Sequence, residues 1–467
     1  MSSRPAVLVL VFVVVASAAV AQDALDLARM MFENGDYAGA ARVFEAEVLR
    51  GTASGADTAM YAIALSETDR DEEAAAVAAE LVATHGERGF AQYAAGIVAF
   101  NATDYADAAD RFERATALAP GRAEYRFALA ISLVNVGATH REDGEIDRAA
   151  DAYRAALDLR VDDARVLASI AEGLGAAGDP TGRLAALEAW ARTDPGSPAA
   201  WAQLGAARRA AGAEPAALEA FRRAVLLGTD EPGPYLAVAR ADHDLPTLHL
   251  AIGAAIHKAG ALELGAARQL ERDDGQMDEA VLRSVEAYAD QLSATRGQLS
   301  QALALLSDWT PSDEFERDVR MLMDWYPHSV ELTAVLARYY EEHGDPGRAA
   351  VLWRDAVRQA PGFADAHVGL GRCQERAGQL DAATASYRRA LAIDGDNRDA
   401  YAALADLFRR RGRLGELRQV LIDRNTIDAW NPILLEELIA VERELGLDEI
   451  ATSRAERLEE MRAESPQ

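Results

Sequence analysis

The 467-residue sequence contains little of what disulfide-bonded, metal-binding or nucleic-acid-binding proteins require. Cysteine occurs once, as Cys373, which excludes an intrachain disulfide, a four-cysteine zinc site and a cysteine-ligated iron–sulfur cluster. With no histidine or second cysteine accompanying it, this residue is expected to be a small buried side chain. Lysine also occurs once, and 76 acidic residues outnumber 48 basic ones, for a net charge of -28. Such acidity disfavours nucleic acid and anionic lipid as partners, because both attract basic surfaces.

The sequence also lacks the motifs of common enzymes. It contains no Gly-x-x-x-x-Gly-Lys-Ser/Thr phosphate loop, no His-Glu-x-x-His zinc helix and no Gly-x-Ser-x-Gly nucleophile elbow. The residues Asp242, His243, Asp244, His249 and His257 offer zinc-ligand chemistry, but their spacing fits no compact site. We therefore interpret them as surface or helix-end residues and expect no catalysis, no metal site and no cofactor.

The N-terminal segment, 1–21, has the pattern of a secretory signal peptide. Arg4 precedes a nearly unbroken apolar run from Val7 to Ala19, and a small-x-small cleavage site ends at Ala21, before Gln22. The run is shorter than the ~20 residues that a membrane-spanning helix needs. We predict cleavage after Ala21 and export, to the periplasm, with an uncleaved membrane anchor as the alternative. No later apolar run is long enough to span a bilayer, so we expect no integral membrane span after cleavage.

What the sequence does contain is a repeat with a period of 34 residues. A small residue recurs with this spacing, and each step is 34 except for one of 41 and one of 64. The positions are Ala40, Ala74, Ala108, Ala149, Arg183, Ala217, Ala251, Phe315, Ala349, Ala383, Leu417 and Ala451. Arg183, Phe315 and Leu417 depart from the small-residue pattern and are assigned by spacing alone.

The repeated motif resembles that of tetratricopeptide repeat (TPR) proteins, of the exported bacterial type. One copy reads Trp201, Leu204, Gly205, Gly212, Ala217, Phe221 and Ala224. The resemblance covers essentially the whole mature chain and implies an all-α fold, a right-handed superhelical solenoid of about twelve TPR helical hairpins. Small residues at positions 8 and 20 let the paired helices approach closely, an aromatic near position 24 fills the gap to the next hairpin, and glycine at position 15 permits the turn.

Two interruptions divide the predicted solenoid. The step of 41 makes an insertion around 136–144, which we expect to lengthen a first helix or its turn. The step of 64 makes a longer insertion, and apolar spacings of 3, 4 and 7 predict one long amphipathic helix over 278–306. That helix is interpreted either as an irregularity packed on its neighbours or as a dimerisation or docking helix. The expected organisation is a signal peptide at 1–21, an N-terminal TPR array at 22–264, an irregular repeat with the insertion at 265–328 and a C-terminal TPR array at 329–467.

In TPR proteins, fixed positions of each first helix point into the concave groove, and the resemblance implies two candidate partner-binding surfaces here. The N-terminal one is apolar and partly aromatic, which suits a helical or extended apolar peptide. Its members are Ile63, Tyr93, Ile97, Phe100 and Leu133. The alternative is that adjacent first helices simply pack these residues against each other.

The C-terminal surface is rich in arginine. The segment 351–424 contains 13 Arg and 10 acidic side chains, for a net charge of +3 within an otherwise acidic chain. The candidate groove residues are Arg338, Arg372, Arg376, Arg409 and Arg410. Arginine binds carboxylates bidentately, so an acidic peptide or an anionic polymer is a candidate ligand. The alternative is a solvated face with intrahelical Glu/Asp–Arg pairs.

Together these features predict a non-enzymatic protein–protein interaction scaffold or adaptor in a bacterial envelope assembly or secretion system. Its partners would be proteins or peptides bound in the concave groove. A second hypothesis is an envelope polysaccharide- or peptidoglycan-binding protein that uses the Arg-lined C-terminal groove.

Overall fold

Every regular element in the described part of the chain is an α-helix, which confirms the all-α class. The computed structural model describes residues 21–272, 279–427 and 431–464. The predicted signal peptide lies almost wholly outside these ranges. None of the helices within them is long and apolar enough to cross a membrane. The chain divides into two compact units, Met1–Thr229 and Asp230–Gln467.

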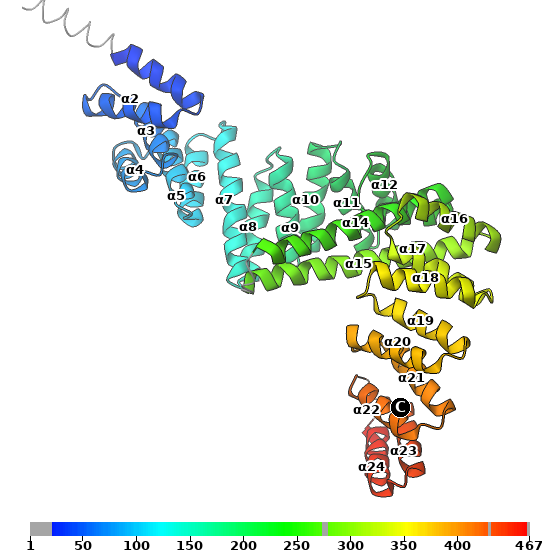
Figure 1. The fold of residues 1–467 in the computed structure, drawn as a ribbon. Helices are drawn as coiled ribbons and strands as arrows, with labels where there is room; N and C mark the ends of the chain where they lie inside the picture. Colours follow the sequence, from blue (N-terminus) through cyan, green and yellow to red (C-terminus); the bar gives the residue numbers. More distant parts are fainter. Residues whose placement is uncertain (1–20, 273–278, 428–430, 465–467) are drawn as a thin grey trace, which may run out of the picture. The chain divides into compact units, whose positions relative to one another are not determined.

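Unit 1 is a series of helical hairpins joined by short turns (Figure 1). A helix at 21–33 pairs with α2, and the remaining helices alternate as first and second members of successive hairpins. Their bounds are α2 Tyr37–Leu49, α3 Gly55–Ser66, α4 Asp71–His85, α5 Gly89–Asn101, α6 Tyr105–Leu118, α7 Ala123–Glu142, α8 Ile146–Asp158, α9 Ala164–Ala176, α10 Pro180–Thr193, α11 Pro198–Ala210 and α12 Glu214–Leu226. Connections this short make consecutive helices antiparallel neighbours.

The turns within hairpins depend on a residue in the left-handed backbone region. Gly212 has a φ of 75° between α11 and α12, where a side chain would be strained. Thr103 takes the equivalent place between α5 and α6 with a φ of 62°, so glycine is preferred there but not essential. Asp104 follows it and caps α6 by accepting a hydrogen bond from the Asp107 amide.

Close approach of paired helices follows from glycines that face aromatic rings. A Cβ added to Gly205 on α11 would lie 2.6 Å from the Phe221 ring on α12, and Gly96 faces Phe112 at the same distance. Because no side chain fits there, the ring itself fills the space between the helices. This confirms the predicted role of the small residue at position 8. The aromatic at position 24 was expected to fill the gap to the next hairpin, but its ring packs against the glycine of its own hairpin.

The shorter insertion lengthens α7. This helix has 20 residues, whereas α5 and α9 on either side of it have 13 each. First helices begin at Gly55, Gly89 and Ala123, which keeps the regular spacing of the repeat, so the extra residues extend the C-terminal end of α7. The first of the two structures offered by the sequence, a longer first helix, is the one observed.

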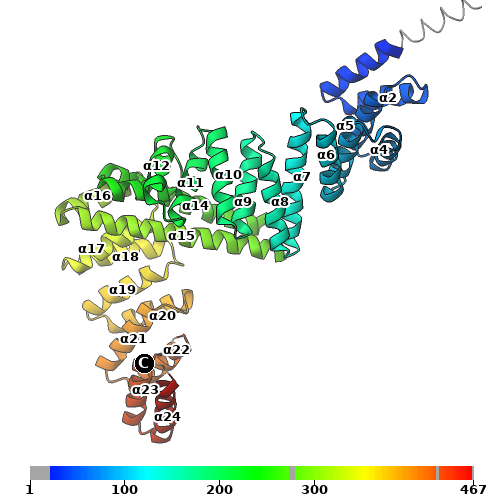
Figure 2. The ribbon, with the colours of Figure 1, turned by 180° about the vertical axis from the view of Figure 1, so that it is seen from behind.

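Unit 2 contains the longer insertion. Its helices are α13 Pro232–Asp242, α14 Leu245–Arg272, α15 Glu279–Trp309, α16 Ser312–Trp325, α17 Val330–Glu342, α18 Pro346–Gln359, α19 Ala364–Arg376, α20 Leu380–Ile393, α21 Arg398–Arg410, α22 Leu414–Ile427, α23 Pro432–Glu444 and α24 Asp448–Glu464. The predicted long helix is α15, but the insertion also extends α14, which the sequence did not indicate. These two helices pack side by side as one long hairpin (Figures 1 and 2).

The expected boundary between residues 264 and 265 differs from this arrangement, because both residues lie inside α14. A Cβ on Gly265 would come within 2.9 Å of the Tyr288 ring on α15. Gly265 therefore allows α14 and α15 to pack closely, and α14 continues past it.

Candidate binding groove

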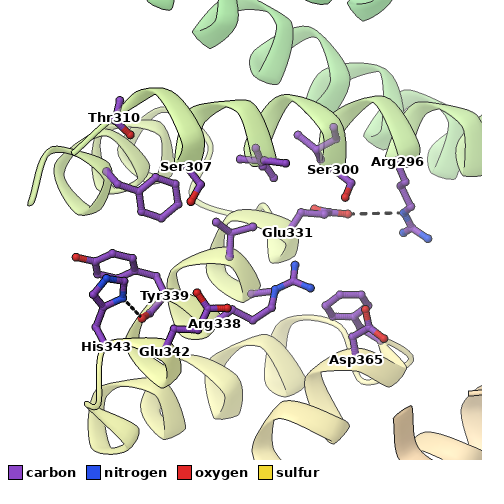
Figure 3. Close-up of a pocket in the computed structure, with 17 residues that line it drawn as sticks. Arg296, Ser300, Ser307, Thr310, Glu331, Arg338, Tyr339, Glu342, His343 and Asp365 are labelled. Carbon is purple, nitrogen blue, oxygen red and sulfur yellow. Dashed lines mark hydrogen bonds and ion pairs between the residues drawn. The ribbon is translucent and has the colours of Figure 1, made fainter. Parts of the chain in front are cut away.

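A groove of about 770 Å³ lies on the first-helix side of unit 2. One wall comes from α15, the other from α17, and the far end is formed by Phe363 and Asp365 at the start of α19 (Figure 3). The repeat explains this placement, because positions 2, 5, 9 and 13 of α17 are Glu331, Ala334, Arg338 and Glu342, and all four line the groove. The groove thus occupies the positions expected to face the concave side.

The α15 wall presents small side chains. Ser300, Ala304 and Ser307 are exposed and line the groove. Beneath them, Leu299 and Leu303 are buried, at 1% and 5% exposure, and form the floor. The accessible part of this wall is therefore mostly hydroxyl and methyl surface, without a large apolar side chain.

Aromatic rings gather at one end of the groove. Tyr339 stacks on His343 with ring centroids 4.1 Å apart and packs against Phe315 at 5.3 Å. Phe315 is buried, whereas Tyr339 is half-buried with part of its surface toward the groove. The stacked pair gives this end of the groove a rigid, partly apolar surface.

Charges of both signs line the groove. Arg296 on α15 forms ion pairs with Glu263 at 2.6 Å and with Glu331 at 3.7 Å (Figure 3). Arg338, Glu342 and Asp365 are exposed, and none of the three forms an ion pair or side-chain hydrogen bond with the part of the chain that the structure describes. Their hydrogen-bonding groups face solvent at the groove (Figure 3).

The other predicted arginines bind carboxylates of neighbouring repeats. Glu341 on α17 forms ion pairs with Arg372 on α19 at 3.0 Å and with Arg376 at 3.7 Å. One repeat further on, Glu375 pairs with Arg410 in the same way. These inter-repeat pairs form what we call the carboxylate ladder. It differs from the intrahelical pairing considered as the alternative.

Arg409 pairs with Asp406 on its own helix at 2.8 Å and with Glu437 on α23. Of the five arginines expected to form one surface, Arg338 alone therefore lines the groove without an intramolecular partner in the described ranges. The reason lies in the preceding repeat. Ser307 on α15 occupies the position that Glu341 occupies on α17, so no carboxylate meets Arg338 there.

The predicted apolar residues of unit 1 are all half-buried. Tyr93 stacks on Tyr125 of α7 with centroids 4.7 Å apart, and burial raises the pKa of Tyr93. The other four pack against clusters of buried side chains. They are Ile63, Ile97, Phe100 and Leu133. Phe100 also packs edge-on against Tyr105, with ring centroids 5.2 Å apart. Much of the surface of the predicted residues thus contributes to packing between helices, while the part left exposed remains a candidate for partner binding.

Phe127 is a first-helix residue that the sequence reasoning missed. It lies on α7 at 39% exposure, in the first turns of the helix, in the position that Tyr93 takes in α5. If the repeat positions of α7 are numbered backward from the second helix, the insertion displaces every first-helix position by its own length. If they are numbered forward from the start of α7 at Ala123, 34 residues after Gly89, Phe127 falls at a groove position.

The cysteine and two of the histidines considered above as reactive groups or metal ligands pack against neighbouring side chains. No group of three or more His, Cys, Asp or Glu side chains in the described ranges is arranged to hold a metal ion. His243 stacks on Trp309, and His249 faces Asp318 at 3.7 Å. Cys373 is buried at 3% exposure, and burial, with the Glu341 charge, raises its pKa to about 11. A thiol with this pKa is inert at neutral pH, as expected of a buried structural cysteine.

Comparison with known proteins supports the repeat assignment. A family model described as tetratricopeptide repeat matches residues 335–398, which run from α17 to the start of α21. Cellulose synthase operon protein C of Xanthomonas axonopodis pv. citri (strain 306) is 41% identical in a 97-residue alignment that covers 19% of this chain and 6% of that protein.

Among solved structures, that of Naa15/Naa10 bound to HypK-THB aligns over 94% of this chain and 75% of its own, with 14% identity and a TM-score of 0.31. A score this low supports no inference about this chain. The family match shows tetratricopeptide repeats at 335–398, and helices elsewhere in the described ranges pair in hairpins in the same way.

Proposed function

We propose that this chain is a non-catalytic protein-interaction scaffold of a bacterial envelope system that secretes polysaccharide. The observation that carries the proposal is the open first-helix face of the tetratricopeptide hairpins, which in unit 2 forms a groove of about 770 Å³. Similarity to a protein named for a cellulose synthase operon supports the association with polysaccharide. The predicted export of the chain would place it in the envelope.

Binding would use surfaces that exist before the partner arrives. The helices that form the groove walls have buried cores, and the carboxylate ladder joins α17 to α19, so little ordering entropy is lost on binding. In unit 1 the corresponding surface includes the exposed ring of Phe127 and the half-buried ring of Tyr93. Replacing Tyr93 would also disturb its stack with Tyr125, so an exposed residue is the better probe.

Site-specific photo-crosslinking tests the scaffold. A photoreactive phenylalanine analogue placed at Phe127, 39% exposed on first helix α7, should crosslink a protein of the polysaccharide-secretion system in the source bacterium. The matched control is Leu118, 41% exposed on second helix α6, which should capture no such protein. Mass spectrometry identifies the captured proteins.

Two results would contradict the proposal. The first is the absence of any specific adduct at Phe127 when the protein is expressed at its native level. The second is recovery of the same proteins from the Leu118 control, since a scaffold that binds through first helices must distinguish the two faces.

A further inference from the structure

We infer that the groove between α15, α17 and α19 binds a segment of a neutral, hydroxyl-rich polysaccharide. Direct contact with glycan would add to the scaffold function and does not depend on it. The volume of about 770 Å³ falls in the range of roughly 300–1,000 Å³ that is typical of ligand sites.

The first reason is the set of polar side chains without a partner. Ser300 and Ser307 on one wall, and Arg338, Glu342 and Asp365 opposite, are exposed and make no side-chain hydrogen bond or ion pair within the described ranges. Elsewhere on the same face, the guanidinium groups of the carboxylate ladder are already occupied. The groove therefore concentrates unused donors and acceptors in one place (Figure 3).

The second reason is the mixture of charge. The carboxylates of Glu342 and Asp365 repel a polyanion, while the Arg338 guanidinium repels a polycation. A hydroxyl group both donates and accepts hydrogen bonds, so one kind of ligand group satisfies the carboxylates, the guanidinium and the two serines. A neutral sugar chain presents such groups along its whole length.

The third reason is the placement of apolar surface. The large aliphatic side chains of the groove, Leu299 and Leu303, are buried in the floor and leave no open pocket for the aromatic or aliphatic anchors on which protein interfaces depend. The apolar surface that remains accessible comes from the half-buried rings of Tyr339 and Phe363, from half-buried Val335 and from the methyl group of Ala304. Sugar rings have apolar C–H faces that pack on such rings while their hydroxyls reach the polar walls. These features favour glycan over a peptide at this site.

The test is isothermal titration calorimetry of the full chain with three probes: cellohexaose, chitohexaose and the polyanion polygalacturonate. We expect at least one neutral hexasaccharide to bind, with an affinity that is unchanged between roughly 50 and 500 mM salt, because no ion pairing drives it. Arg338→Ala and Asp365→Ala should each weaken binding about tenfold, as loss of a hydrogen bond to a charged group does. Arg354→Ala, an exposed arginine on second helix α18, should have no effect.

Three outcomes would overturn the inference. They are no binding of either neutral probe at about 1 mM, preferential salt-sensitive binding of polygalacturonate, and equal weakening by Arg354→Ala.

A photoreactive residue placed at His343, which is exposed at the groove, tests whether a protein binds there. If it captures a protein while neither sugar binds, the groove is a protein site and the scaffold proposal stands. If a sugar binds while the photoreactive residue at Phe127 captures no protein, the glycan inference stands and the scaffold proposal fails.

Discussion

Replacing Glu442 should loosen the C-terminal hairpins of unit 2. This carboxylate on α23 is fully buried and lies between two arginines, accepting from Arg418 Nε on α22 at 3.0 Å and from Arg454 Nε on α24 at 3.0 and 3.1 Å. It therefore links three helices through one pair of oxygen atoms. The variant Glu442→Gln keeps the volume, removes the charge and turns an N–H₂ group toward guanidinium donors.

The expected cost is about 3 kcal/mol, at the lower end of the range for such sites. Removing one partner of a buried ion pair typically costs about 3–5 kcal/mol, because the remaining charge stays desolvated. Here Arg418 and Arg454 retain 26% and 27% exposure, so water screens part of the penalty and the lower end applies. A loss of about 3 kcal/mol corresponds to roughly 100-fold faster hydrogen exchange by local opening.

Hydrogen exchange with mass spectrometry measures this for individual helices. Exchange should accelerate in α22, α23 and α24, whereas α17 should change little, because stability in repeat arrays depends on nearest neighbours. The control Glu459→Gln removes a carboxylate that is 73% exposed and paired with Arg462, and it should change stability by less than about 0.5 kcal/mol.

An acceleration below about threefold for Glu442→Gln would refute this reasoning, as would an equal effect of the Glu459 control. A triple replacement tests the cause. Changing Glu442, Arg418 and Arg454 together to methionine removes all three charges, and it should recover most of the lost stability. If the triple variant is no more stable than Glu442→Gln, loss of packing and not an unpaired charge explains the effect.

Two further predictions concern unit 2. Gly371→Val should lower stability by about 2 kcal/mol, because even a Cβ at this position would lie 2.5 Å from the Tyr387 ring. In the control Gly260→Ala, the added Cβ would meet no atom within 4 Å, and stability should rise by about 0.5–1 kcal/mol. Denaturant unfolding compares the two, and a stabilising Gly371→Val would contradict the packing. Burial lowers the pKa of His249, outweighing the opposite effect of Asp318, so the unfolded chain takes up a proton first as pH falls. Stability should therefore decline below about pH 6.5, and the decline should be smaller in His249→Asn. Thermal unfolding measured from about pH 7.5 to 5.5 tests this. A wild-type melting temperature that does not change over this range would contradict the prediction.

The hairpin architecture was accessible from the sequence because its causes are local and periodic. A glycine such as Gly205 and an aromatic such as Phe221 hold fixed positions of one repeat, so their spacing predicts contact before any tertiary structure is known. The lengthening of α7 follows in the same way from two helical turns of extra residues. The long helix α15 was predicted from its apolar spacing.

The extension of α14 was not predictable in this way. Gly265 suggests a helix end when it is considered alone, but in the structure it permits close contact with Tyr288 on the opposite helix of the hairpin. The helix continues because α15 packs along it, and that partner lies across a separate segment of sequence. Local pattern contains no information about such a contact.

The helices, their pairing in hairpins and the few kinds of reactive group in this protein thus follow from residue spacing and composition. Which side chains remain available for binding depends on contacts that form in the folded chain. Arg338 and Arg372 occupy the same position of successive repeats, yet Arg372 pairs with Glu341, whereas the residue equivalent to Glu341 in the repeat before Arg338 is the uncharged Ser307. Whether a charge is free depends on the residue of the preceding repeat that stacking places beside it, and stacking brings those residues together only in the folded chain.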